Sequence, residues 1–458
     1  MTDQSSAPAD YDEAAIARMR AFVEEVTGGR IVRMERQVRW RPAWFADVER
    51  DGGEILKLHL RGDRAGDVAI FPDLKREADI MSILHDHGIP VPRIYGYCQD
   101  PPCIVMDALP GTRDVFAGTD EAQRASIGRE YMAAVAAMHK LPLEPFVERA
   151  GVHLPQGAEE IALVGLRAYL PHYRRTKRRP EPLLEFVIQW LQRNVLTHRT
   201  RASYIQFDSG QFLVENGKMT GLYDFEFSMI GDPMTDLATM AMRNSIEPLG
   251  RPFPELCRYY EEAAGEPLDH EAVRFHNLVF ATLGTMQFTG TVADPNPGDP
   301  HSVYLEWDLS LRRTILLALA ELLDTTLPEP SVEAGRGNFP ALIKALEDTI
   351  STISAAEPID ESRKTQALEL VEWLSHEDRM GGYARDRDIA EIAAYLGRGF
   401  DSIDAAQEAL EAHVLQAGPD EEAALFQLLA TLEQRRMAVF GPTKIGHSAR
   451  NVALVPTR

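Results

Sequence analysis

Apolar positions recur with a period of two over the first quarter of the chain and with helical spacing over most of the rest. An amphipathic segment over 11–25 ends at Gly28 and Gly29, and a second helical segment over 74–87 ends at Gly88. Around them, short alternating runs predict an antiparallel meander with a tight turn at 51–53. The predicted strands are 31–40, 43–49, 55–61, 93–97 and 103–107.

Helical spacing dominates from residue 120 onward, with one β-rich interruption over 204–227. Asn216-Gly217 lies between two apolar runs there, which is a strong hairpin signal. Beyond a Pro-rich linker at 327–330, the pattern predicts helices near 338–355, 361–377, 386–397, 403–415 and 419–438. We therefore predict three parts, namely residues 1–108, 109–328 and 331–458.

Composition narrows the class of protein without defining its function. The chain has 458 residues, of which 45% are hydrophobic and 26% charged, and its net charge is −22. Such a negative balance disfavours binding to nucleic acid or to anionic membrane surfaces. The three cysteines are scattered, the N-terminus has no apolar leader, and no apolar run is long enough to span a bilayer. We therefore predict a cytoplasmic protein with neither nucleic-acid nor membrane partners.

The β-rich interruption carries the most informative residues. Asp224-Phe225-Glu226 follows the predicted hairpin, and Gly231-Asp232-Pro233 opens the next helix. This segment resembles the aminoglycoside phosphotransferase and choline kinase-like superfamily, in which a loop H-G-D-x-x-x-x-N precedes a hairpin, a D-x-E motif and a G-D-P-x-x-D-L helix start. The resemblance implies an α+β, two-lobed protein-kinase-like fold, with an antiparallel N-terminal sheet, a mainly helical C-terminal lobe and, here, an additional C-terminal all-α domain.

In such a site a carboxylate orients and deprotonates the acceptor hydroxyl, while amide and carboxylate oxygens hold Mg²⁺ against the phosphates. By resemblance, Asp224 is the metal-binding Asp, and Glu226 lies beside it. Asp232 and Asp236 match acids that brace the loop rather than touch substrate. The cofactors implied are ATP and Mg²⁺.

The loop itself departs from the family pattern, and two alignments remain open. Without a gap, Gln206 stands at the catalytic Asp and Gln211 at the metal-binding Asn, and Gln cannot act as a general base. With the loop shortened by two residues, 206–208 matches H-G-D, so Asp208 becomes the catalytic carboxylate and Gln211 still replaces Asn. We prefer the alignment with the shortened loop. The alternative is that Asp208 has only a structural role, as a turn residue.

The N-terminal part supplies candidates for nucleotide binding. A strand cation and a helix Glu are needed to orient the phosphates, and a period of two places Lys57 and Arg61 on one strand face. By resemblance Arg61 is the better match, with Lys57 close behind, and Glu77 is the helix partner. The resemblance also makes 104–111 the hinge that binds adenine, so that Met106, Asp107 and Ala108 line the cleft. His139 is interpreted as a packed helix residue.

These observations predict a small-molecule kinase, an ATP- and Mg²⁺-dependent phosphotransferase that acts on a hydroxyl group. The alternative is a pseudokinase that binds nucleotide or metabolite, or an interaction scaffold; nucleotidyl transfer is a weaker third possibility. The basic run 173–179 is either a solvated helix end or a binding site for the phosphate groups of an acceptor such as an acyl-CoA. The C-terminal helices could form a homodimer or cap the cleft.

Overall fold

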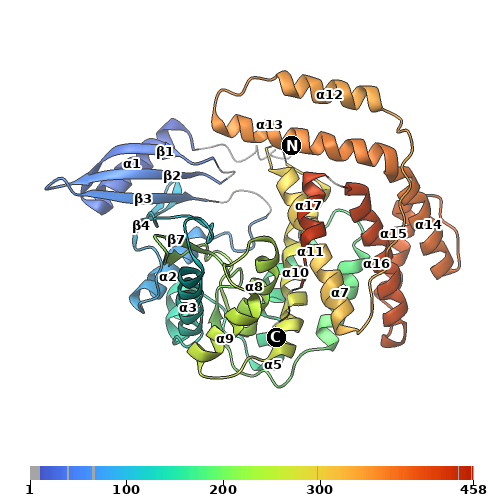
Figure 1. Ribbon diagram of the computed structural model, residues 1–458, viewed down its shortest axis with the longest axis horizontal. Helices are drawn as coiled ribbons and strands as arrows, with labels where there is room; N and C mark the ends of the chain where they lie inside the picture. The colour runs from blue at the N-terminus through green and yellow to red at the C-terminus, as the bar shows by residue number, and fades with distance from the viewer. Residues whose placement is uncertain are drawn as a thin grey trace. The chain divides into compact units, whose positions relative to one another are not determined.

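The computed structural model describes residues 11–38, 41–63, 68–296, 298–441, 443–454 and 456 (Figure 1). The chain forms two compact units that are interleaved in sequence. The first comprises Met1–Ala168, Leu196–His276 and Val455–Arg458, and the second Tyr169–Val195 and Asn277–Leu454. Helices α6 (Val164–Thr176) and α10 (His270–Ala293) begin in the first unit and end in the second.

The first unit begins with a five-stranded antiparallel sheet of order β1-β2-β3-β5-β4. Its helices are α1 (Glu13–Thr27) and α2 (Leu74–Asp86). Its strands are β1 (Gly29–Arg36), β2 (Ala43–Arg50), β3 (Ile55–Gly62), β4 (Ile94–Gln99) and β5 (Pro102–Asp107). The predicted meander is confirmed, although the first strand ends at Arg36, and residues 39–40 of that prediction lie outside the described residues.

Alternation along β3 explains how the sheet presents functional side chains. Leu58 and Leu60 are fully buried and pack with Met19 and Val23 of α1. Because successive side chains point to opposite faces, this packing directs the intervening residues of β3 to the other side. Burial of these four apolar side chains stabilises the folded state by about 1.5–3 kcal/mol per side chain. This packing therefore fixes the orientation of β3.

The remainder of the first unit is mainly helical. It contains α3 (Glu121–Met138), α4 (Glu144–Ala150), α5 (Gly157–Ala162), α8 (Met234–Ile246) and α9 (Phe253–Ala264). The predicted hairpin is β7 (Phe212–Glu215) and β8 (Lys218–Leu222), and β6 (Ser203–Ile205) pairs with β9 (Met229–Gly231). Asn216 and Gly217 have positive φ angles, as a two-residue hairpin turn requires, which confirms that prediction.

The second unit is built from helices. In addition to the parts of α6 and α10, these are α7 (Pro182–Arg193), α11 (His301–Leu322), α12 (Pro340–Thr352), α13 (Pro358–His376), α14 (Gly382–Leu396), α15 (Ile403–Val414), α16 (Glu422–Phe440) and α17 (Lys444–Asn451). A π-helical turn, Glu377–Gly381, joins α13 to α14 without a break. We predicted separate helices there, but Gly381 and Gly382 both have helical φ values. Within the described residues, no helix has the length and apolar character needed to cross a bilayer.

The compact units do not follow the predicted boundary near residue 328. Helix α11 packs against α13, α16 and α17, and α7 packs against α15. Residues 277–328, which we assigned to the middle part of the chain, therefore belong to the same compact unit as the C-terminal helices. The reason is that most residues of α7 and α11 are buried within this helical unit.

Helix α12 exposes most of its apolar side chains. It lies alongside α13 (Figure 1), and none of its residues is buried. Phe339, Leu342, Leu346 and Ile353 are 44–67% exposed and recur at coiled-coil spacing. The predicted homodimer through the C-terminal helices stays a prediction.

Candidate active site

A cleft of about 520 Å³ lies in the first unit, between the sheet and the hairpin β7–β8. Residues from β2, β3, α2, β5 and the segment after β8 contribute to its lining. Those relevant to the predicted site are Phe45, His59, Arg61, Glu77, Met106, Asp107, Ala108, Tyr223 and Asp224. The structure thus brings together residues that are separated by more than 160 positions in the sequence.

Arg61 and Glu77 form a buried ion pair at one end of this cleft. Arg61 Nε donates to Glu77 Oε2 over 2.9 Å, and the two residues are only 6% and 3% exposed. Glu77 Oε1 also accepts from the backbone N–H of Phe225, at 3.2 Å. Burial alone would lower the pKa of Arg61, but the Glu77 and Asp224 carboxylates raise it well above its ordinary value. Arg61 is therefore held as a fixed positive charge, in the pairing that we predicted.

Asp224 lies against the same guanidinium. Its Oδ1 accepts from Arg61 Nη2 over 2.8 Å, and its backbone adopts a positive φ of 66° directly after β8. Glu226 Oε2 accepts from Arg41 Nη2 at 2.5 Å and lies 3.9 Å from Arg61. Two arginines and three carboxylates therefore form one cluster. The metal-binding roles of Asp224 and Glu226 stay predictions, and the Arg41 contact gives Glu226 a bracing role as well.

Lys57 lies outside the cleft that contains Arg61, whereas the predicted hinge lines that cleft. Lys57 is exposed and is not among the residues that line the cleft. Its carbonyl oxygen accepts from the N–H of Ala108 over 2.9 Å, which fixes the chain after β5. Met106 and Asp107 line the cleft with Ala108, and Asp107 Oδ1 accepts from the Tyr95 hydroxyl at 2.9 Å. The geometry therefore places Arg61, and not Lys57, at the cleft, and a phosphate-binding role for either stays a prediction.

Asp208 is held by two side chains at the tip of the loop between β6 and β7. Its Oδ2 accepts from Gln211 Nε2 over 2.9 Å, and its Oδ1 is ion-paired with Arg243 Nη2. Gly210 has a φ of 90°, and a Cβ there would lie 2.7 Å from the Arg243 side chain, so this position requires glycine for two reasons. Burial raises the pKa of Asp208, and the Arg243 charge opposes that rise.

Gln206 lies in the interior of the first unit, and its assignment as a catalytic residue stays a prediction. It is fully buried, and its Nε2 donates to the carbonyl oxygen of Tyr223 over 2.8 Å. Since the carboxylate of Asp208 is instead 20% exposed, the structure favours the alignment with the shortened loop.

Of the two acids that follow the hairpin, Asp236 braces this loop, as predicted, whereas Asp232 has its partners outside the loop. Asp236 accepts from the backbone N–H groups of Gln206 and Phe207, at 3.1 and 2.8 Å. It also contacts His139 Nε2 at 3.0 Å, and the other ring nitrogen of His139 lies 2.8 Å from the Tyr260 hydroxyl. His139 is thus a packed, satisfied histidine. Asp232 pairs with Arg199 over 2.8 Å; burial opposes its ionisation, but hydrogen bonds from Arg199 and His276 hold its pKa well below the ordinary value.

Arg243 and Arg41 are the site residues that the sequence analysis missed. Arg243 lies seven residues after Asp236 on α8, so both face the loop from two turns of one helix, and that spacing was a usable signal. Arg41 follows the connection between β1 and β2, and its contact with Glu226 spans 185 positions. No local pattern marks such a contact.

Replacing Arg243 with Gln is expected to move the acid limb of the kcat/KM profile to higher pH. The cation now opposes the effect of burial, so its loss raises the pKa of Asp208 further, and the base becomes protonated at a higher pH. Arg243→Lys keeps a charge and should shift the limb less. A pH–rate profile of the three proteins measures this, and an unchanged limb, or one moved to lower pH, would contradict the assignment of Asp208.

The basic run at 173–179 has carboxylate partners within its own unit for four of its five cations, while Arg175 Nη2 lies 3.3 Å from His172 Nδ1. Its cations pair with carboxylates as follows: Arg174 and Lys177 with Glu185, Lys177 also with Glu411, Arg178 with Asp294, and Arg179 with Glu181. These contacts support the structural interpretation of the run. They give no support to the hypothesis that it grips an acyl-CoA phosphate.

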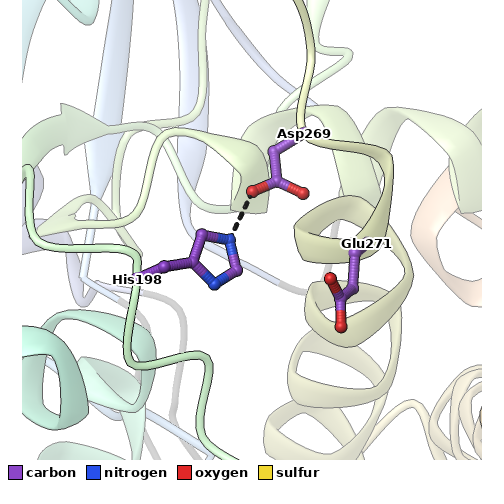
Figure 2. Close-up of side chains that lie close together, drawn as sticks. All are labelled: His198, Asp269 and Glu271. Atoms are coloured by element: carbon purple, nitrogen blue, oxygen red, sulfur yellow. Dashed lines mark hydrogen bonds and ion pairs between the residues drawn. The ribbon is translucent and has the colours of Figure 1, made fainter.

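A separate cluster in the first unit contains His198, Asp269 and Glu271 (Figure 2). The His198 ring points toward Asp269, and its Nε2 lies 2.7 Å from Asp269 Oδ2. Asp269 Oδ1 also accepts from the N–H of Ala272, and Arg199 lies 3.6 Å from its Oδ2. Because a cation and a helix cap already engage Asp269, we interpret this group as a surface ion-pair cluster.

The family assignment follows from this arrangement and from comparison with known proteins. Residues 41–276, more than half of the chain, match the phosphotransferase enzyme family. The chain belongs to this family. The matched stretch contains the strand cation, the hinge, the loop of Asp208 and the Asp224 segment.

Individual relatives are distant and cover only part of the chain. Acyl-CoA dehydrogenase family member 10 of Mus musculus is 25% identical over 184 residues, which are 36% of this chain and 16% of that protein. Acyl-CoA dehydrogenase family member 11 of Homo sapiens is 23% identical over 182 residues, 37% of this chain and 23% of that protein. The chain therefore spans less than a quarter of the length of either relative.

A solved structure confirms the fold class. A protein of Ralstonia eutropha JMP134, described provisionally as an aminoglycoside phosphotransferase, superimposes with a TM-score of 0.52 at 15% identity, over 68% of this chain and 99% of that one. The chain has the two-lobed kinase-like fold of that class, with further helices at its C-terminal end.

Proposed function

We propose that the protein transfers a phosphoryl group from ATP to a hydroxyl group of a small molecule, with Mg²⁺ as cofactor. The observation that carries the proposal is the cleft of about 520 Å³ that unites the Arg61–Glu77 ion pair, the 106–108 hinge and Asp224. Phosphoryl transfer depends chiefly on positioning and on neutralising charge. A buried, permanently charged arginine beside a carboxylate provides both.

The described residues fit a nucleotide and its metal. The backbone of 106–108 lies at the cleft wall where adenine would bind, and Arg61 is oriented by Glu77 toward the phosphates. The carboxylate of Asp224 and the amide oxygen of Gln211 are hard oxygen ligands of the kind that Mg²⁺ prefers. When bound, Mg²⁺ neutralises negative charge on the phosphates.

Asp208 is the general base in this proposal. Its carboxylate is fixed from two sides by Gln211 and Arg243, so it can orient the acceptor hydroxyl and accept its proton. A pKa raised by burial makes it a stronger proton acceptor than an exposed Asp, while the charge of Arg243 opposes the rise.

A second candidate is a pseudokinase that binds nucleotide without turnover. Two contacts favour it. Gln211, which stands where the family pattern has Asn, donates a hydrogen bond from its amide to Asp208, and Asp224 is ion-paired with Arg61. Both carboxylates therefore already have partners in the structure. Catalysis requires that nucleotide and metal compete successfully with these contacts.

The names of the mouse and human relatives refer to acyl-CoA, which makes hydroxyacyl-CoA thioesters the first acceptors to try. Amino alcohols, sugars and aminoglycosides complete the panel. The proposed acceptor class rests on these names, because four of the five cations in the basic run at 173–179 pair with carboxylates of the protein itself.

Calorimetric titration with ATP in the presence of Mg²⁺, followed by ADP release assays with this panel, tests the proposal. We expect saturable ATP binding and acceptor-dependent turnover, both weakened in Asp224→Asn and unchanged in Asp51→Asn, an exposed matched control. Binding without turnover on any acceptor would support the pseudokinase instead. The absence of ATP binding would contradict both candidates.

A further inference from the structure

Helix α12 is held in place at both ends although none of its residues is buried. Before its first turn, the carboxylate of Asp378 accepts from the backbone N–H groups of Asn338 and Phe339, at 2.8 and 3.0 Å. After its last turn, Lys364 Nζ donates to the carbonyl oxygen of Ile353 over 2.9 Å. A helix of this length is marginal on its own in water, and helices in proteins are stabilised mainly by packing of their apolar face. The structure therefore presents a fixed helix whose outer apolar face is not covered by the described residues.

The uncovered face of α12 and its two capping residues consists of large apolar side chains, which we call the α12 stripe. Its members are 44–67% exposed, and they are Phe339, Leu342, Leu346 and Ile353. At helical spacing, the charged residues of α12 fall on the rest of its circumference. They are Lys344, Glu347 and Asp348, and Lys344 Nζ pairs with Asp348 Oδ1 within the helix over 2.5 Å. A contact through the stripe would therefore bury no charge.

The stripe is symmetric about Leu346. Uncharged residues stand three, four and seven positions before it and again three, four and seven positions after it, namely Ile343, Leu342 and Phe339, then Thr349, Ile350 and Ile353. A two-fold axis through Leu346, perpendicular to the helix, would place each of these positions opposite another of them on an antiparallel second copy. Self-complementarity of this kind is what an isologous dimer interface requires.

The size of the stripe also fits a second copy of this chain. Large side chains that are about half exposed each leave roughly 100 Å² of apolar surface uncovered, so two stripes together would bury roughly 800 Å². Because apolar atoms make up about 65% of a homodimer interface, the whole contact would bury about 1,200 Å², the lower limit for a specific interface. A lipid surface is a poorer match, because interfacial helices are rich in Lys and Arg, whereas α12 has Lys344 alone against Glu347 and Asp348.

We propose that two copies of this chain associate through the α12 stripe, with the two helices antiparallel and a two-fold axis at Leu346. Phe339 of each copy then packs on Ile353 of the other, and the two Leu346 side chains meet at the axis. Since the contact area is at the lower limit, the dimer is weak, with a Kd of about 1–100 µM. The stripe lies in the second unit, so this proposal is independent of the proposed phosphotransfer.

Sedimentation equilibrium of the full chain, at concentrations from below to above this Kd range, tests the proposal. Leu346→Glu and Leu346→Lys each place two like charges at the axis, so each should weaken the dimer by at least about tenfold. An equimolar mixture of the two variants brings opposite charges together there and should restore association to within a few-fold of the wild type. Leu415→Glu is the matched control, because Leu415 is 51% exposed in the same unit but lies outside the stripe; its Kd should equal that of the wild type.

Several results would overturn the proposal. A wild type that stays monomeric at roughly ten times the upper Kd has no such interface, and a dimer that persists in Leu346→Glu uses another surface. If both Leu346 variants are monomeric and their mixture is monomeric too, the axis does not pass through Leu346. A monomeric wild type that binds phosphatidylcholine vesicles would assign the stripe to a lipid surface. Thermal unfolding checks that the variants are folded, and Leu342→Glu, at the 67% exposed position of the stripe, replaces any that is not.

Discussion

Asp208→Asn is expected to lower kcat by about 10²–10⁴-fold, the usual contribution of a general base. The substitution preserves the shape of the side chain and can still accept from Gln211, but it removes the negative charge that takes the proton. Since Asp208 is not among the residues that line the large cleft, ATP affinity should stay within a few-fold of the wild type. Steady-state turnover together with calorimetric ATP binding measures the two effects separately.

Gln206→His is the informative companion variant. An imidazole N–H can replace the amide that now donates to the Tyr223 carbonyl, so this variant should keep most of its activity. If Asp208→Asn retained full turnover, the shortened-loop alignment would fail, and Asp208 would be a turn residue only.

Arg61→Met is expected to reduce the free energy of unfolding by about 3–5 kcal/mol and to abolish detectable ATP binding. It leaves Glu77 as an uncompensated charge in an interior position and releases Asp224 from its partner. Burial already raises the pKa of Glu77 against the opposing charge of Arg61, and loss of the guanidinium would raise it further. The folded state then favours the protonated acid, so the stability deficit should be larger at pH 8 than at pH 5.

Lys57→Met provides the control for this experiment. Lys57 lies on the same strand and the same face but is exposed, so its replacement should change stability by less than about 0.5 kcal/mol. Urea denaturation at the two pH values compares both variants with the wild type. Equal losses for Arg61→Met and Lys57→Met would show that the buried pair has no special role.

Local patterns in the sequence were sufficient for the sheet, whereas the Arg61–Glu77 pair was predicted from the family resemblance. The period of two along β3 placed Arg61 and Lys57 on one face, and Glu77 followed on the next helix. The choice between Arg61 and Lys57 depended on how deeply each side chain is buried. Lys57 lies near the turn that leads into β3, whereas Arg61 lies at the far end of the strand, against α2 and Asp224. Sequence spacing alone does not measure this burial.

Contacts between distant segments could not be predicted in the same way. Arg243 reaches Asp208 across 35 positions, and Arg41 reaches Glu226 across 185. The helix break that we expected between 377 and 386 was also absent, because a π-helical turn accommodates both glycines with helical backbone angles. Tertiary packing decided each of these features.

The interleaved units have a consequence for synthesis on the ribosome. Most residues of helix α7 are buried, and its packing partner α15 ends at Val414, about 220 residues later. At roughly 5–20 residues per second, the nascent chain would carry that uncovered helix for roughly ten to forty seconds. Truncation before α15 would leave it permanently uncovered. Production of shortened chains should therefore depend on chaperones far more than production of the full-length protein.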